Sequence, residues 1–342
     1  MAFGFTGARR LLAAALLVFA TGAANVAVSA PTPEADFAAR CAASGVLVCQ
    51  GFEAIPKTTG GDGLYPILGS NSYAGVLDTS VKASGGGALR FDIATKSGDD
   101  PAGHWEQGFT KSFGANSTFY VQYRQRFDTN FITFNWGSTG SGTSPKQSVF
   151  YDGNATPCDA VELTAVDYYS SGVPIVYSEC GDNAAYGDPN NIGSYSKTGN
   201  LQQGSSKTSG YNCPQDRGTQ GTGNGVGCFE YVADKWITFY FQVDVGTWGQ
   251  ANSSVQAWMS VDGGPYQQWV NVKNYTLRQG AGKSFNRVML TPYMTGKSAS
   301  IANPLSHTWY DELIVSTSPI AAPGAPAQTA VAPNPPSNVT AN

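Results

Sequence analysis

The 342-residue sequence is short of charged residues and of histidine. Asp, Glu, Lys and Arg make up 13% of it, against about 25% in ordinary domains, and there are two histidines. Twenty basic residues against 24 acidic ones give a net charge of −4. A chain without a basic excess lacks the electrostatic field that nucleic-acid binding normally requires. We therefore expect no nucleic-acid partner.

Long apolar runs are also scarce, apart from one at the N-terminus. Arg9 and Arg10 precede the run LLAAALLVFATGAA, which is followed by small residues ending in VSA. This order predicts a secretory signal peptide over residues 1–30, cleaved after Ala30. A membrane anchor is the alternative, but the run is short and no second apolar stretch follows it. Cleavage would leave 18 basic and 24 acidic residues, a net charge of −6, on a secreted or periplasmic protein without a membrane segment.

No CxxC pair occurs among the six cysteines, which argues against a zinc cluster. In an exported chain, six cysteines indicate three disulfides, and fifteen pairings are possible. Proximity along the chain favours the pairs Cys41–Cys49, Cys158–Cys180 and Cys213–Cys228. Each would close a short loop and stabilise the fold by about 2–3 kcal/mol in the chain-entropy model.

Long segments with the 3.6-residue apolar period of an amphipathic helix are missing, and PEADFAARCA near the N-terminus is the one short candidate. Instead, residues 31–318 contain short runs rich in Val, Tyr, Phe and Trp between turn residues, which predict an all-β sandwich. No Pro/Ser-rich linker interrupts this stretch, so we expect one domain and a monomer. Residues 319–342 are rich in Pro and Ala and predict a disordered tail or the stub of a linker.

Several predicted strands have one apolar face and one polar-aromatic face. In FYVQYRQRF (119–127) the period of two puts four large apolar side chains on one side and Tyr120, Gln122, Arg124 and Arg126 on the other. The runs 236–245 and 254–262 repeat this asymmetry. Aromatic rings and amides suit the flat faces and hydroxyls of sugars. The recurrence indicates a concave sheet that binds a ligand, and a solvated sheet face is the alternative.

Four motifs occur in combination: CQGFE (49–53), SGGGALRFDI (84–93), FYVQYRQRF and HTWYDELIVS (307–316). Together they resemble the concanavalin A-like jelly rolls of secreted bacterial proteins, above all the polysaccharide-lyase-like branch of heparin, alginate and glucuronan lyases. The resemblance spans Val46 to Ser318 and implies a jelly-roll sandwich with a concave ligand-binding sheet. The same fold carries hydrolases, lectins and carbohydrate-binding modules, so the fold alone does not decide the activity.

The resemblance implies β-elimination on a uronate-containing polysaccharide. This reaction needs a group that neutralises the uronate carboxylate, a base for the C5 proton and an acid for the leaving oxygen. Lyases of this fold use Arg, Gln or Asn for the first task and His or Tyr for the others. On this basis the candidate catalytic residues are Arg124, Gln122, His104, His307 and Tyr293. The candidate substrate-binding residues are Tyr120, Arg126, Lys146, Gln147, Gln242 and Trp258.

Two departures keep other activities open. The R-[ST]-E-L-R, Q-[IV]-H and YFKAG-like signatures of well-known alginate lyases are absent, so roles do not transfer residue by residue. The E-x-D-x-x-E pattern of retaining glucanases is absent too, and Asp311 and Glu312 are adjacent and expected on opposite faces, which argues against hydrolysis. A non-catalytic, lectin-like protein is the main alternative to the lyase, and a structural protein without a sugar ligand is a third.

A structural Ca²⁺ site is a further implication of the resemblance. Glu53, the backbone carbonyls of the SGGG turn and Asp311 would supply hard oxygen ligands, which suit Ca²⁺. The alternative is that Asp311 caps a loop or accepts backbone N–H groups. No organic cofactor is expected.

Overall fold

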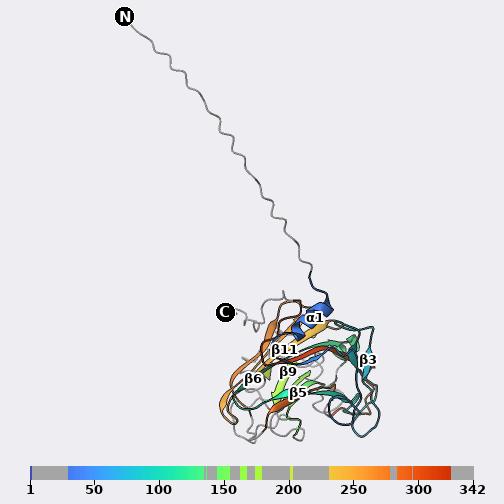
Figure 1. The fold of residues 1–342 in the computed structure, drawn as a ribbon. Helices are drawn as coiled ribbons and strands as arrows, with labels where there is room; N and C mark the ends of the chain where they lie inside the picture. Colours follow the sequence, from blue (N-terminus) through green and yellow to red (C-terminus); the bar gives the residue numbers. More distant parts are fainter. Residues whose placement is uncertain are drawn as a thin grey trace. The chain divides into compact units, whose positions relative to one another are not determined.

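The computed structural model describes Met1 and residues 30–134, 136, 145–154, 162–167, 174–178, 201–202, 231–277, 283–294 and 296–324 (Figure 1). The chain divides into two units, Met1–Ala30 and Pro31–Asn342. Residues 2–29, which carry most of the predicted signal peptide, lie outside the described residues, so that prediction stays a prediction. None of the described helices is both long enough and apolar enough to cross a membrane.

The described part of Pro31–Asn342 contains two antiparallel sheets. The eight-stranded sheet has the order β13 (Gln267–Thr276), β12 (Ala251–Val261), β11 (Trp236–Val245), β6 (Ser117–Phe127), β15 (Ser306–Ser316), β4 (Ala88–Ile93) and β3 (Val76–Asp78), and β1 (Val46–Gln50) also pairs with β15. The seven-stranded sheet has the order β10 (Leu201–Gln202), β9 (Pro174–Ser178), β8 (Glu162–Asp167), β7 (Lys146–Tyr151), β14 (Phe285–Leu290), β5 (His104–Phe113) and β2 (Gly63–Tyr65). The described helices are α1 (Pro33–Cys41) and α2 (Thr129–Thr133).

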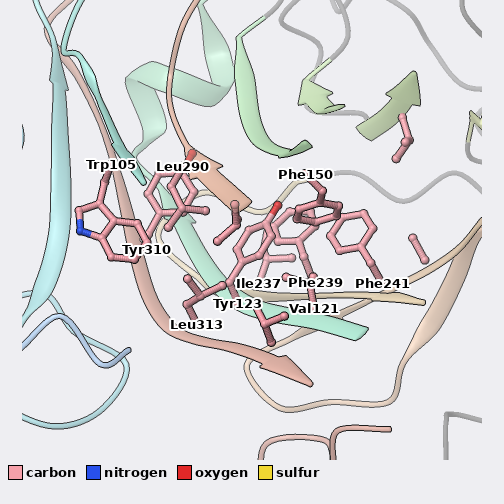
Figure 2. Close-up of a cluster of buried hydrophobic side chains, with 14 of the residues drawn as sticks. Trp105, Val121, Tyr123, Phe150, Ile237, Phe239, Phe241, Leu290, Tyr310 and Leu313 are labelled. Atoms are coloured by element: carbon pink, nitrogen blue, oxygen red, sulfur yellow. The ribbon is translucent and has the colours of Figure 1, made fainter. Parts of the chain in front are cut away.

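The two sheets pack against each other through their apolar faces. Figure 2 shows Trp105 and Phe150 of the seven-stranded sheet in one buried cluster with Tyr123 and Phe241 of the other. The rings of Phe150 and Phe241 meet edge to face at 5.2 Å, and the Tyr123 hydroxyl lies 3.0 Å from the Ser148 hydroxyl across the core. Each buried side chain of this size contributes about 1.5–3 kcal/mol through the apolar area removed from water. The expected all-β sandwich is confirmed, and the apolar face of residues 119–127 is its core face.

Helix α1 packs near the first strand and is tied to it covalently. Thr32 caps the helix by accepting a hydrogen bond from the Ala35 N–H, and Pro33 occupies the first turn, where a missing N–H costs nothing. The Cys41–Cys49 disulfide joins the end of α1 to β1, with a Cα–Cα distance of 5.6 Å. The other predicted pairs, Cys158–Cys180 and Cys213–Cys228, lie outside the described residues.

The C-terminal segment also packs onto the domain. Ile320 is buried in a cluster with Tyr240, Trp258 and Ile314, against which Phe37 of α1 also packs. This cluster is separate from the core between the sheets. Packed chain therefore continues beyond Ser318, the expected end of the domain, to about Gly324, where the Gly324 N–H donates to Asp36 of α1.

Candidate functional site

The outer face of the eight-stranded sheet is covered where the sequence predicts the floor of a groove. Gln122 is fully buried: its Oε1 accepts from Arg40 of α1 at 2.7 Å, and its Nε2 donates to the Tyr266 hydroxyl and to the Ala321 carbonyl, each at 3.0 Å. Arg40 also pairs with Glu312. The guanidinium of Arg124 lies 3.4 Å from the same carboxylate. Among the described residues, Gln122 and Arg124 thus belong to a buried network with Arg40 and Glu312, to which α1 and the C-terminal segment contribute.

The remaining candidates on this sheet have structural partners as well. Tyr120 stacks on Tyr240, and Trp258 is buried beside the same ring. The Gln242 amide donates to Asp244 on its own strand. Tyr120 and Trp258 belong to the cluster that also contains Phe37 of α1 and Ile320 of the C-terminal segment. Tyr120 and Gln242 remain half-buried.

Arg126 and His307 lie at the far end of the same face. Arg126 pairs with Asp234 and lies over the Trp309 ring at 5.8 Å. His307 Nδ1 lies 2.8 Å from an Asp128 carboxylate oxygen, and its Nε2 lies 3.6 Å from Asp92. Both ring nitrogens of His307 therefore face carboxylates, and Asp128 also accepts the His307 backbone N–H at the start of β15.

Glu53 and Asp311 flank one turn, as the calcium prediction requires. Asp311 accepts the N–H groups of Ala83 and Ser84, and Glu53 accepts that of Gly86. The buried Ser84 hydroxyl has no hydrogen-bond partner among the described residues. No group of three or more His, Cys, Asp or Glu that could hold a metal exists in the described part of the chain. Two carboxylates and a hydroxyl are hard oxygen donors, which fit Ca²⁺. The calcium site at Glu53 and Asp311 therefore stays a prediction.

The outer face of the seven-stranded sheet carries a different kind of cluster. Strand pairing places Glu106 opposite Met289 and Arg287 opposite both Gly108 and Tyr151. Because Trp105 and Leu290 point into the core, the alternating residues of β5 and β14 point outward. We call His104, Glu106, Tyr151 and Arg287 the outer-face cluster.

Hydrogen bonds and ion pairs connect its members through one carboxylate. His104 Nε2 lies 3.2 Å from Glu106 Oε1, and Arg287 Nη1 lies 3.4 Å from Glu106 Oε2. The Tyr151 phenol interacts with the same carboxylate: it lowers the pKa of Glu106, and the charge of Glu106 raises the pKa of Tyr151. The imidazole stacks on the Tyr65 ring at 5.0 Å. The side chains of His104 and Arg287 keep 27% and 21% of their surface exposed, so solvent and a ligand can reach them.

The cluster holds its carboxylate charged and its phenol neutral. Burial raises the pKa of Glu106, but hydrogen bonds from His104 and Tyr151 and the charge of Arg287 outweigh burial, so the pKa lies below its ordinary value. Burial, reinforced by the Glu106 charge, raises the pKa of Tyr151 far above its ordinary value. Burial raises the pKa of Tyr65 in the same direction. At neutral pH both phenols are therefore protonated beside an ionised carboxylate.

Three further candidates lie on the same sheet. The Lys146 ammonium sits over the Tyr293 ring at 5.3 Å, and the Tyr293 hydroxyl donates to Asp99 at 3.3 Å. Gln147 is fully buried; its Oε1 accepts from the Tyr231 hydroxyl, and its Nε2 has no partner among the described residues. The structure brings Lys146, the first residue of β7, into contact with Tyr293, three residues after the end of β14.

Of the outer-face cluster, the sequence indicated only His104 as catalytic. Glu106 stands two residues from it, so both side chains share one strand face, and this spacing was a usable signal. Tyr151 and Arg287 carry no comparable signal, because only the strand pairing of β7, β14 and β5 brings them to Glu106.

No protein-family model matches the sequence, and no curated protein matches it either. Among solved structures, the chain is similar to the PL-14 alginate lyase from Aplysia kurodai, with 13% identity and a TM-score of 0.50 over 80% of this chain and 99% of that one. It is also similar to an endo-β-1,4-glucuronan lyase from the fungus Trichoderma reesei, with 11% identity and a TM-score of 0.46 over 81% and 98% of the two chains. The first similarity confirms the fold: a jelly-roll sandwich of the type found in polysaccharide lyases.

Proposed function

We propose that the protein is a secreted polysaccharide lyase that cleaves a uronate-containing polysaccharide by β-elimination at the outer-face cluster. The observation that carries the proposal is the connected set of an imidazole, a phenol and a guanidinium around Glu106 on a solvent-accessible sheet face. The Cys41–Cys49 disulfide fits an oxidising compartment outside the cytosol.

The reaction assigns one task to each side chain. A base removes the C5 proton of the uronate, the electrons of that bond form the C4=C5 double bond, and the C4–O bond breaks. His104 is the base. The ionised Glu106 accepts a hydrogen bond from the N–H on Nε2, so in the neutral imidazole Nδ1 carries the free lone pair. Tyr151 donates a proton to the leaving oxygen, since its phenol stays protonated until a strongly basic alkoxide develops.

Arg287 neutralises the substrate carboxylate, which makes the C5 proton more acidic. The hydrogen bonds and ion pairs of its guanidinium with described residues use Nη1, which donates to the Gly61 carbonyl and faces Asp62 and Glu106. The N–H groups on Nη2 and Nε are not used by these contacts and remain as donors. Glu106 is a positioning residue: it orients His104 and Arg287 and does not itself transfer a proton.

The test compares two guanidinium groups that each face a glutamate, one on each sheet. Mature protein would be incubated with alginate, glucuronan, heparin-type glycans, pectate and hyaluronan, and the ultraviolet absorbance of the unsaturated uronate product would be followed. We expect product from one substrate. Arg287→Ala should lower kcat/KM about 10–100-fold, because a charged hydrogen bond contributes about 1.5–3 kcal/mol. Arg124→Ala should leave kcat/KM unchanged.

Three results would contradict the proposal. Retention of the protein on one polysaccharide in affinity electrophoresis without unsaturated product would favour the lectin-like alternative. New reducing ends without unsaturated product would indicate hydrolysis. Equal losses in both variants, or a loss in Arg124→Ala alone, would remove the reaction from the outer-face cluster.

A further inference from the structure

The carboxylate of Asp62 sits at the rim of the outer-face cluster in a set of three donors. Asp62 Oδ1 accepts from the Gly108 N–H at 2.7 Å and faces Arg287 Nη1 at 3.2 Å. Asp62 Oδ2 accepts from the Gln107 side-chain amide at 2.8 Å. The Asp62 side chain remains 46% exposed, so the place where these donors converge opens to solvent.

This donor set is a complete carboxylate-binding site. A guanidinium, an amide and a backbone N–H supply charge and direction to both oxygens of a carboxylate. Gly108 lies directly against both groups: a Cβ at this position would be in van der Waals contact with Asp62 Oδ1 at 3.4 Å and with Arg287 Nη2 at 3.6 Å.

The turn that carries Asp62 is held both at its tip and at its base. At the tip, the Gly61 carbonyl accepts hydrogen bonds from the Tyr65 hydroxyl and from Arg287 Nη1. Backbone hydrogen bonds of 3.0 and 2.7 Å link Thr58 to Leu64 and Leu64 to Pro56. At the tip, the space beside Gly60 and Gly61 contains no described atom within 4 Å of a built Cβ. Gly61 has φ +91°, a conformation natural to glycine. The Asp62 side chain, which is 46% exposed, can leave its donors by rotating into solvent while the turn itself stays paired.

We infer that Gln107, the Gly108 N–H and Arg287 form a subsite for a sugar carboxylate, and that Asp62 is its internal occupant, which the substrate carboxylate displaces. The inference rests on the proposed function for the identity of the ligand as a uronate. Without substrate, Asp62 keeps the buried side of Arg287 paired. When the substrate binds, its carboxylate replaces the contacts that Asp62 loses. A neutral hydroxymethyl group would not replace them, so the exchange selects acidic sugars over neutral ones.

The kinetic test is Asp62→Asn, which keeps the shape of the side chain and removes its charge. A weaker occupant leaves the subsite open for a larger fraction of the time, so KM for the cleaved polysaccharide falls about three- to tenfold, with kcat unchanged. The matched control is Asp100→Asn: the Asp100 carboxylate also anchors a neighbouring loop by accepting the N–H groups of Leu68 and Gly103. An unchanged or higher KM in Asp62→Asn overturns the inference, and so does an equal fall in both variants, which would be a general effect of charge.

A binding measurement separates this inference from the proposed function. Sodium glucuronate and glucose would be titrated into ¹⁵N-labelled wild-type protein while the Gly108 amide and the Gln107 side-chain amide are followed by NMR. We expect both signals to shift with glucuronate and not with glucose, and to saturate at lower concentration in Asp62→Asn. Shifts without any unsaturated product from polysaccharides would support the subsite and overturn the lyase. Product formation without shifts would keep the lyase and overturn the subsite.

Discussion

The outer faces of the two sheets carry similar residue types and differ in what covers them. On the eight-stranded sheet, Arg40, Arg124, Gln122 and Glu312 form a network in which the side chains of Arg40 and Glu312 are 3% and 1% exposed. On the seven-stranded sheet, the His104 and Arg287 side chains keep 27% and 21% of their surface. Both faces combine guanidinium groups with a glutamate, so residue type alone does not distinguish a site from a structural joint.

The difference shows what each network can do. A buried ion pair has already lost its water and is held by its partners, so no substrate can displace them at low cost. A half-exposed pair exchanges its partners for solvent or for a ligand at a small free-energy cost. The outer face of the eight-stranded sheet, the covered face, joins the two ends of the folded domain. The outer face of the seven-stranded sheet, the open face, is where a polyanion can compete for a guanidinium.

The largest expected contrast comes from the two histidines. Each imidazole is about a quarter exposed and faces carboxylates, Glu106 for His104 and Asp128 with Asp92 for His307. We expect His104→Asn to lower kcat/KM about 10²–10⁴-fold, the usual contribution of a general base, and His307→Asn to leave kcat/KM unchanged while lowering thermal stability. Measuring product formation and the melting temperature of both variants checks the contrast. Loss of activity in His307→Asn alone would instead place the reaction on the outer face of the eight-stranded sheet.

The period of two was sufficient to predict the strand at residues 119–127 and its core face, but no pattern predicted β5, which carries His104 and Glu106. The period of two in residues 119–127 placed Phe119, Val121, Tyr123 and Phe127 inward, and all four are fully buried. The pattern could not show which polar face stays open, because the cover comes from distant chain. Arg40 reaches Gln122 across 82 positions and Glu312 across 272. Long-range contacts of this kind leave no local periodicity.

The second largest effect is expected in the covered network. Arg40→Met removes one of the two guanidinium partners of the buried Glu312 and one partner of Gln122, and breaking a buried ion pair costs about 3–5 kcal/mol. Urea unfolding would measure this loss, and kcat/KM below the unfolding transition should match the wild type.

The double variant Arg40→Met with Glu312→Gln serves as the control for that network. Its loss should be smaller than the sum of the two single losses, because the residues share one interaction. Additive losses would mean that the two side chains are not coupled, and a fall in kcat/KM would link the covered face to catalysis.

A smaller effect is expected from the disulfide that fixes α1. Cys41 and Cys49 are eight positions apart, and opening a loop of this length costs about 2–3 kcal/mol in the chain-entropy model. The variant Cys41→Ser with Cys49→Ser should show this loss in urea and retain its activity. Wild-type protein treated with a reducing agent provides the comparison. No loss on reduction would mean that α1 is held by the Arg40 network alone.

The smallest expected effect concerns Ca²⁺ at Glu53 and Asp311, where the turn carrying Ser84 meets the covered sheet. An ion that binds only the folded state at ten times its Kd stabilises by about 1.4 kcal/mol. Ca²⁺ should therefore raise the melting temperature, a chelator should reverse the rise, and Asp311→Asn should abolish the response without changing kcat. A melting temperature indifferent to Ca²⁺ would leave the two carboxylates as acceptors of backbone N–H groups. A response of kcat instead would mean that the covered face acts on the open one through the core, since Tyr310, next to Asp311 on β15, donates to the Gln147 carbonyl of the seven-stranded sheet.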